Sequence, residues 1–136
     1  MGHTLRIRIY YEDTDCGGVV YYANYLRYVE RARTEFLEAR GVSLRALMDE
    51  GVYFVVAEAA LKYLSPGRYG DILKIETNVE RVGPASIVFR HAIGRDLSGE
   101  KLVEATVKLG CVGQDMKPLR LRQNILDAVT KTDGIS

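Results

Sequence analysis

The chain has 136 residues, 47% hydrophobic and 27% charged, which is enough to bury the core of one globular domain and excludes a disordered chain. Its formal net charge of +1 supplies no field that would attract nucleic acid or an anionic membrane. No apolar run approaches the roughly 20 residues of a membrane span, and the first residues carry no signal peptide. We therefore expect a cytoplasmic protein without membrane insertion or a nucleic-acid partner.

The first part of the chain predicts one strand and two helices. Leu5, Ile7 and Ile9 alternate with polar residues, which predicts a strand over residues 5–11. Residues 23–40 have the period of an amphipathic helix that ends at Gly41. Its apolar stripe consists of Tyr25, Tyr28, Val29, Ala32, Phe36 and Ala39. Ser43 is suited to cap a shorter helix that runs through residue 50.

The second part of the chain changes to a period of two, which is typical of strands. Strands are predicted over residues 52–64, 73–82, 86–95 and 101–112, with a short helix over 124–131. His91 lies on the apolar face of the third of these strands, where we expect it to pack in the core or at an interface. The order of elements predicts one domain over residues 1–136, an α+β fold with an antiparallel sheet and one central helix.

The expected sheet has more apolar surface than one helix can cover. The last strands are long and apolar on at least one side. An edge strand of this kind favours pairing with a second copy of the chain. We therefore expect at least a homodimer.

The residues best suited to chemistry lie in the loop that leads into the first helix, residues 10–25. It contains the acids Glu12, Asp13 and Asp15, followed by two glycines. A helix start offers free backbone N–H groups and positive potential, which suit an oxyanion. An upstream carboxylate can act as base or nucleophile in the hydrolysis of an activated carbonyl. The same residue types make good turns, so spacing alone leaves a structural role open.

Several other kinds of site are disfavoured. Asp13, Asp15 and Gly18 match positions 1, 3 and 6 of a calcium loop, but the twelfth position is Asn24 and not an acid. No zinc-ligand cluster, Gly-x-Ser-x-Gly elbow or phosphate loop occurs in the sequence. Cys16 has no histidine near it in sequence, so we expect a small apolar residue and not a nucleophile. No metal is expected.

The loop reads Glu12-Asp13-Thr14-Asp15, then Gly18-Val19-Val20-Tyr21, then Asn24-Tyr25. This pattern closely resembles the signature of the hotdog-fold acyl-CoA thioesterases. Within them it is most similar to the 4-hydroxybenzoyl-CoA thioesterase family and its bacterial branch encoded beside the Tol-Pal envelope genes. The resemblance runs over about residues 5–128 and includes Glu30-Arg31-Ala32-Arg33-Thr34-Glu35, Ala46-Leu47-Met48, Phe54-Val55-Val56, Cys111-Val112 and Met116-Lys117-Pro118.

The resemblance implies a hotdog fold, a five-stranded antiparallel sheet wrapped around a long central helix, in chains that form homodimers or homotetramers. It implies hydrolysis of an acyl-CoA without a cofactor, since coenzyme A is part of the substrate. The family's catalytic aspartate falls on Asp15, as general base or nucleophile, and its carbonyl-polarising backbone N–H falls on Tyr22. The Tol-Pal branch commonly has histidine at the position of Tyr22, which leaves open whether the acyl group is short-chain or aromatic.

The resemblance also suggests where the substrate lies. Tyr11, Gly18 and Val19 are candidates to line the site. Coenzyme A carries phosphates, so basic side chains are expected near the mouth. The candidates are Arg81, Arg90, Lys117 and Arg120, with Ser86 as a neutral donor.

Two other functions remain open from the sequence. An enoyl-thioester hydratase on the same fold usually pairs an acid with histidine, and no histidine lies near Asp15 in sequence. A protein that binds acyl carrier protein, or an interaction protein at the cell envelope with weak hydrolysis, is the second alternative.

Overall fold

The structure is a computed structural model and describes residues 2–15 and 17–130. Its elements, in chain order, are β1 (His3–Arg8), the short 3-10 helix η1 (Tyr11–Asp13), α1 (Asn24–Ala39), α2 (Leu44–Asp49), β2 (Tyr53–Tyr63), β3 (Ile72–Val82), β4 (Ser86–Arg95), β5 (Lys101–Val112) and α3 (Gln123–Thr130). None of the helices within the described residues combines the length and the apolar character that crossing a bilayer requires.

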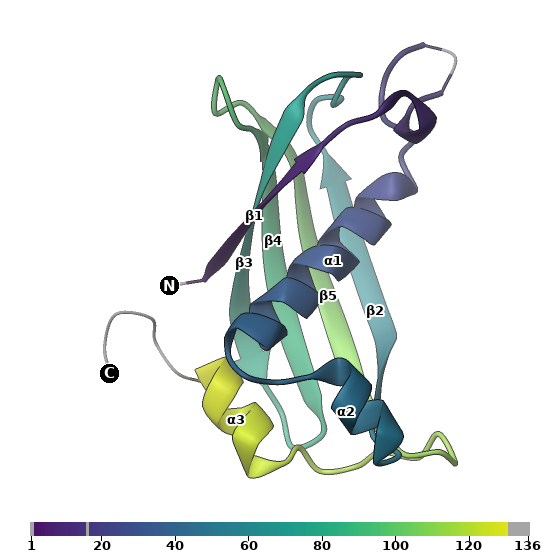
Figure 1. Cartoon of the computed structure of the whole chain (residues 1–136), viewed down its shortest axis with the longest axis vertical. Helices are drawn as coiled ribbons and strands as arrows, with labels where there is room; N and C mark the ends of the chain where they lie inside the picture. The colour runs from purple at the N-terminus through teal and green to yellow at the C-terminus, as the bar shows by residue number, and fades with distance from the viewer. Residues whose placement is uncertain (1, 16, 131–136) are drawn as a thin grey trace.

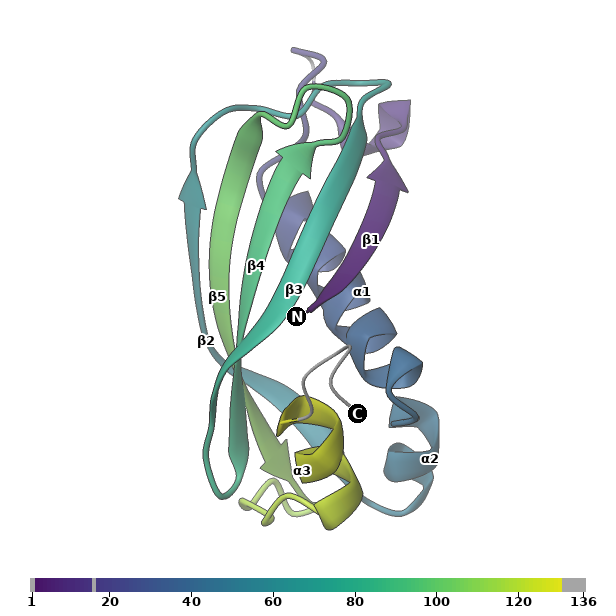
Figure 2. The same cartoon turned by 90° about the vertical axis from the view of Figure 1, so that its left-hand side faces the viewer.

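The strands form one five-stranded antiparallel sheet in the order β1-β3-β4-β5-β2. The helices lie on one side of this curved sheet, and α1 runs across its concave face (Figures 1 and 2). This α+β arrangement confirms the expected hotdog fold, a sheet wrapped around a long central helix.

The core lies between α1 and the sheet. The predicted stripe of α1 is buried from Tyr25 to Phe36, and the Phe36 ring meets Phe89 of β4 edge to face at 5.4 Å. At the end of the helix the prediction was wrong, because Ala39 is exposed and Leu37 is buried instead. Arg33 is also buried, on the same side of the helix.

The first strand is displaced relative to its expected bounds. It begins at His3 and ends at Arg8, where residues 5–11 were predicted. The carboxylate of Asp13 accepts a hydrogen bond from the Tyr10 amide at 2.8 Å, and the Asp13 amide donates to the Tyr10 carbonyl at 3.0 Å. These local bonds bend the chain into η1 and end the strand early.

The edges of the sheet differ from the expectation based on the last strands. β5 lies between β4 and β2, so the long C-terminal strand is internal and cannot pair with another chain. β2 is an edge, and it is open to solvent: Val56 is 54% exposed, and Ala59 and Ala60 are also exposed. An apolar open edge of this kind favours strand pairing with a partner.

Among the described residues, three polar or charged side chains are buried: Arg33 of α1, Thr77 of β3 and His91 of β4. His91 is 1% exposed, as its position on the apolar face of β4 predicted, and its Nδ1 shares a 2.9 Å hydrogen bond with Thr77 Oγ1. Burial lowers the pKa of His91 to about 3, and the nearby Arg33 cation adds to the decrease. The folded protein therefore holds His91 neutral.

This burial predicts a pH dependence of stability. The pKa of His91 is about 6.5 in the unfolded chain and lower in the folded protein, so the unfolded chain binds one more proton between the two values. The free energy of unfolding should therefore fall as pH drops below about 6.5, by up to about 1.4 kcal/mol per pH unit from this residue. Urea unfolding between about pH 5 and 6.5 measures this slope, above the range in which most carboxylates titrate.

The variant His91→Asn isolates the contribution of the imidazole. Its amide can still bond to Thr77 Oγ1, but it does not titrate in this range. In the variant, we expect the free energy of unfolding to depend less steeply on pH, by up to about 1.4 kcal/mol per pH unit. An unchanged slope would contradict the assignment to His91.

Candidate active site

The loop between β1 and α1 folds back on itself as a small hairpin with Asp15 near its tip. The Asp15 amide donates to the Val19 carbonyl at 3.0 Å, and the Gly18 amide donates to the Asp15 carbonyl at 3.1 Å. A bridge between Thr14 and Val20 closes the hairpin below the tip. Gly18 has φ +75°, a left-handed conformation that glycine adopts without the penalty of a Cβ.

The Asp15 side chain is exposed at this tip. Its Oδ1 accepts a hydrogen bond from the Gly17 amide at 3.0 Å, which fixes the orientation of the carboxylate. Within the described residues no group bonds to the second oxygen, Oδ2. Asp15 can therefore present one oxygen to a water molecule or a substrate while the other is held by the loop.

Asp13 has a different role from Asp15. Its carboxylate holds the Tyr10 amide, and its backbone carbonyl accepts from the Tyr21 amide at 3.0 Å and from Asn24 Nδ2 at 2.8 Å. Asp13 thus ties the hairpin to the first residue of α1. The described residues contain no cluster of His, Cys, Asp or Glu side chains suited to a metal ion.

The hairpin delivers the chain to the start of α1. The Asn24 amide donates to the Tyr21 carbonyl at 2.9 Å, and the Tyr25 amide to the Tyr22 carbonyl at 3.3 Å. Among the residues that the structure describes, none accepts a hydrogen bond from the Tyr22 amide. This is the kind of free donor, at the positive end of a helix, that can stabilise a developing negative charge.

Exposed tyrosines surround the start of α1. The Tyr22 ring is 62% exposed and packs on the rings of Tyr21, at 4.9 Å, and Tyr63 of β2, at 6.3 Å. The Tyr63 hydroxyl donates to the Tyr22 carbonyl at 3.4 Å. Sequence reasoning missed Tyr63, because it is far from Tyr22 along the chain and only the sheet brings them together.

The loop between β2 and β3, residues 64–71, is joined to the hairpin by backbone hydrogen bonds. The Val20 amide donates to the Gly67 carbonyl at 2.8 Å, and the Tyr69 amide donates to the Gly18 carbonyl at 3.0 Å. Val19 forms a bridge with Arg68. The predicted lining residues Gly18 and Val19 are therefore held by a second loop.

Tyr11, also predicted to line the site, makes a different contact with this loop. Its ring meets the ring of Tyr69 edge to face at 5.9 Å, and its side chain is 76% exposed.

The basic residues expected to bind coenzyme A are not next to Asp15 within one chain. The Asp15 hairpin lies at the end of the sheet where β2 finishes and β3 begins (Figure 1). The opposite end holds the turn between β3 and β4, with Arg81 and Ser86, and the segment that follows β5, with Lys117 and Arg120. Arg90 lies along β4 and pairs with Glu80 at 3.7 Å. A hollow of about 520 Å³ on the face away from α1 contains Arg81 but not Asp15.

The structure describes one of the two cysteines. Cys16 lies outside the described residues. Cys111 is buried on the inner face of β5, and burial raises the pKa of its thiol. A buried thiol of raised pKa has little thiolate character.

Comparison with known proteins gives consistent matches. The Thioesterase superfamily model matches residues 17–98, which include α1 and β2 to β4. The acyl-CoA thioester hydrolase YbgC of Escherichia coli O6:H1 is 43% identical over 121 residues, 88% of this chain and 90% of that protein. The acyl-CoA thioesterase YbgC of Haemophilus influenzae is 40% identical over 126 residues, 91% of each. A solved 1,4-dihydroxy-2-naphthoyl-CoA thioesterase from Synechocystis shares the fold, with TM-score 0.90 over 96% of both chains at 22% identity.

Proposed function

The chain belongs to the thioesterase superfamily, and we propose that it hydrolyses the thioester bond of an acyl-CoA whose acyl group is short-chain or aromatic. The observation that carries the proposal is the exposed Asp15 carboxylate on a hairpin that ends at Tyr22, whose amide bonds to no described residue. Together they supply a base or nucleophile and a donor for negative charge.

In the proposed reaction, the thioester carbonyl oxygen accepts a hydrogen bond from the Tyr22 amide. Asp15 removes a proton from a water molecule, whose oxygen attacks the carbonyl carbon. The carbon–sulfur bond breaks, the thiolate takes up the proton, and the products are a carboxylic acid and free coenzyme A. In the covalent alternative, Asp15 attacks the carbon first, and water then hydrolyses the resulting anhydride. The balance of atoms is the same in both routes.

A dimer through β2 would complete the site. Two copies of an edge strand related by a two-fold axis perpendicular to the sheet run antiparallel. The end of the partner's sheet that holds its basic residues would then lie beside Tyr63, close to the hairpin. We propose that Arg81, Lys117 and Arg120 of the partner subunit meet the phosphates of coenzyme A there.

The acyl group would lie against the tyrosines at the start of α1. Tyr22 and Tyr63 are 62% and 50% exposed, and their rings offer a flat apolar surface with polar tips. A short or aromatic acyl group fits such a surface, whereas a long chain needs an apolar tunnel.

A kinetic screen tests the substrate class. The release of free thiol is measured for short-chain, aromatic and long-chain acyl-CoAs of equal concentration. We expect kcat/KM to be highest for a short or an aromatic group and at least about tenfold lower for a long chain, because a chain without a tunnel clashes with the protein before its carbonyl reaches the Tyr22 amide. A preference for long chains would overturn this part of the proposal.

The same preparation distinguishes the two alternative functions. Water addition to an enoyl-CoA without thiol release would identify a hydratase. Retained binding of acyl carrier protein without hydrolysis of any acyl-CoA would identify an interaction protein. Either result would replace the thioesterase proposal.

A further inference from the structure

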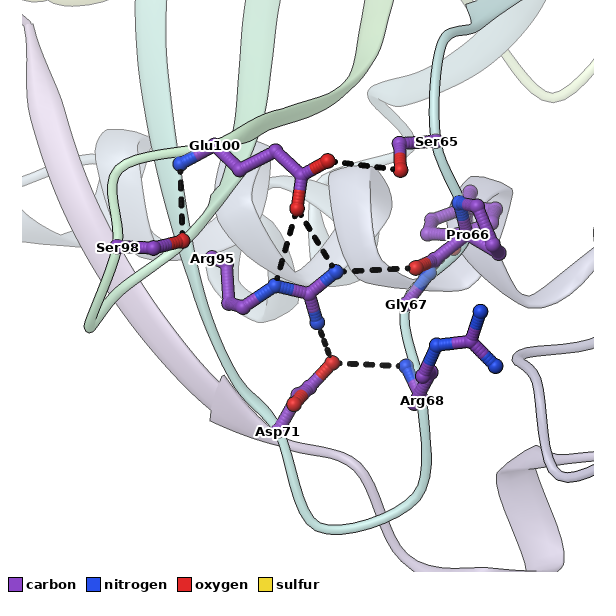
Figure 3. A network of polar contacts seen from close by, with 9 residues as sticks. Ser65, Pro66, Gly67, Arg68, Asp71, Arg95, Ser98 and Glu100 are labelled. Carbon is purple, nitrogen blue, oxygen red and sulfur yellow. Dashed lines mark hydrogen bonds and ion pairs between the residues drawn. The ribbon is translucent and has the colours of Figure 1, made fainter.

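A network of polar contacts, centred on Arg95, lies at the end of the sheet that holds the Asp15 hairpin (Figure 3). Arg95 is the last residue of β4, and its guanidinium forms an ion pair through Nη1 with Asp71. Its Nη2 donates to the Pro66 carbonyl and to Glu100 Oε1, each at 3.2 Å. The Arg95 side chain is only 19% exposed. The fixed fork of donors in arginine suits such simultaneous contacts.

The partners of Arg95 extend the network along the loop between β2 and β3. Glu100 Oε2 accepts a hydrogen bond from the Ser65 hydroxyl at 3.0 Å, and Asp71 Oδ2 accepts from the Arg68 amide at 2.9 Å. Hydrogen bonds from Ser65 and Arg95 lower the pKa of Glu100, which is therefore ionised at neutral pH. The loop is thus held at its beginning, its middle and its end.

The Asp15 hairpin packs against this loop and forms hydrogen bonds with it. Gly67 follows Pro66 directly, and its carbonyl accepts from the Val20 amide at 2.8 Å. The Gly67 amide donates at 2.9 Å to the hydroxyl of Tyr25, which lies in the first turn of α1. A Cβ on Gly67 would lie 3.0 to 3.3 Å from Ile9, Tyr25 and Val20, so the loop and the hairpin fit together without spare space.

The geometry points to Arg95 as a positioning residue for the reaction. It fixes residues 65–71, and through them it sets the place of Gly18, Val19 and Val20 and thereby of Asp15 and the Tyr22 amide. In this role Arg95 acts through the loop and not by contact with the substrate. This role rests on the proposed function, since it concerns the geometry of the same site. A displacement of about 1 Å in a catalytic group can cost about 100-fold in rate.

The variant Arg95→Gln tests this role, with Arg6→Gln as the matched control. Arg6 lies at the same end of the sheet and pairs with Asp96 at 3.1 Å, but its side chain is 57% exposed and it has no bond to the loop. We expect kcat for acyl-CoA hydrolysis to fall about 10- to 100-fold in Arg95→Gln. KM should change less than about threefold, because the substrate contacts remain. Arg6→Gln should match the wild type.

A second readout separates positioning from general stability. Amide hydrogen exchange should become at least about tenfold faster at Val20 and Tyr69 in Arg95→Gln, while amides in the centre of β4 and β5 keep their protection. In Arg95→Ala, millimolar guanidinium should restore part of kcat, and urea at the same concentration should not. If Arg95→Gln does not fold, Glu100→Ala, which removes the acceptor of both Arg95 and Ser65, replaces it in both measurements.

The outcomes separate this inference from the proposed function. The inference is overturned if Arg95→Gln has the kcat of Arg6→Gln, or if its loss is accompanied by faster exchange throughout the sheet and no rescue. If the wild type hydrolyses no acyl-CoA, the proposed function fails, and exchange at Val20 and Tyr69 alone decides whether Arg95 holds the hairpin.

Discussion

Replacing Asp15 with asparagine is expected to lower kcat for acyl-CoA hydrolysis at least about 100-fold, which is the lower end of the usual contribution of a general base. Asparagine keeps an oxygen where Oδ1 accepts from the Gly17 amide, so the hairpin should be preserved. The amide nitrogen that replaces the free Oδ2 can neither accept a proton from water nor attack the carbonyl carbon. Thiol release at saturating acyl-CoA measures the loss, and circular dichroism verifies the fold.

Glu12→Gln is the matched control for Asp15→Asn. Glu12 is an exposed acid in η1 of the same loop, and its side chain has no bond with another described residue. Removing its charge should change kcat by less than about twofold, as is usual for exposed positions away from such contacts. Equal losses in the two variants would show that the general charge of the loop matters and not the position of Asp15.

The second large effect is expected at Tyr22, whose backbone amide, and not its ring, is proposed to stabilise the negative charge on the carbonyl oxygen. The variant Tyr22→Pro removes the N–H group, which should lower kcat by about 100- to 1,000-fold, the typical cost of losing one oxyanion donor. Proline is tolerated near the start of a helix, and the amide that is lost bonds to no described residue. Steady-state kinetics measure the loss, and thermal unfolding verifies that α1 is intact.

Tyr22→Ala separates the amide from the ring. It keeps the N–H group but removes the contacts with Tyr21 and Tyr63. We expect this variant to raise KM more than it lowers kcat, because the ring is proposed to bind the acyl group. Equal kcat values for Tyr22→Ala and Tyr22→Pro would remove the Tyr22 amide from the mechanism.

The local signals in the sequence predicted most of the elements. The bounds of β4 and β5 agree with the prediction to the residue, because clean alternation ends at turn residues on both sides. Ser43 caps α2 as expected, since its Oγ accepts from the Ala46 amide at 3.1 Å. The predicted bounds were wrong where local hydrogen bonds compete with the alternation of apolar and polar residues. After β1, for example, Asp13 bonds to the Tyr10 amide and the strand ends early.

The long-range arrangement could not be read from the same signals. Alternation indicates which face of a strand is buried, but not which strand lies beside it, so the place of β2 at the edge was missed. The contact between Tyr63 and Tyr22 and the network of Arg95 join residues that are distant in sequence. Asp15 and Tyr22 became candidates because the loop pattern resembles a known signature. Spacing alone favours a turn role for Asp15 over a catalytic one.

The most direct test of Asp15 as base or nucleophile is a single-turnover measurement with a preferred acyl-CoA, with enzyme in excess and well above the Kd. Under these conditions the substrate is bound before the reaction, so the rate reports chemistry and not affinity. We predict that Asp15→Asn binds the acyl-CoA with nearly the affinity of the wild type and hydrolyses it at least about 100-fold more slowly. Hydrolysis of the bound substrate by Asp15→Asn at the rate of the wild type would contradict a role of Asp15 as base or nucleophile.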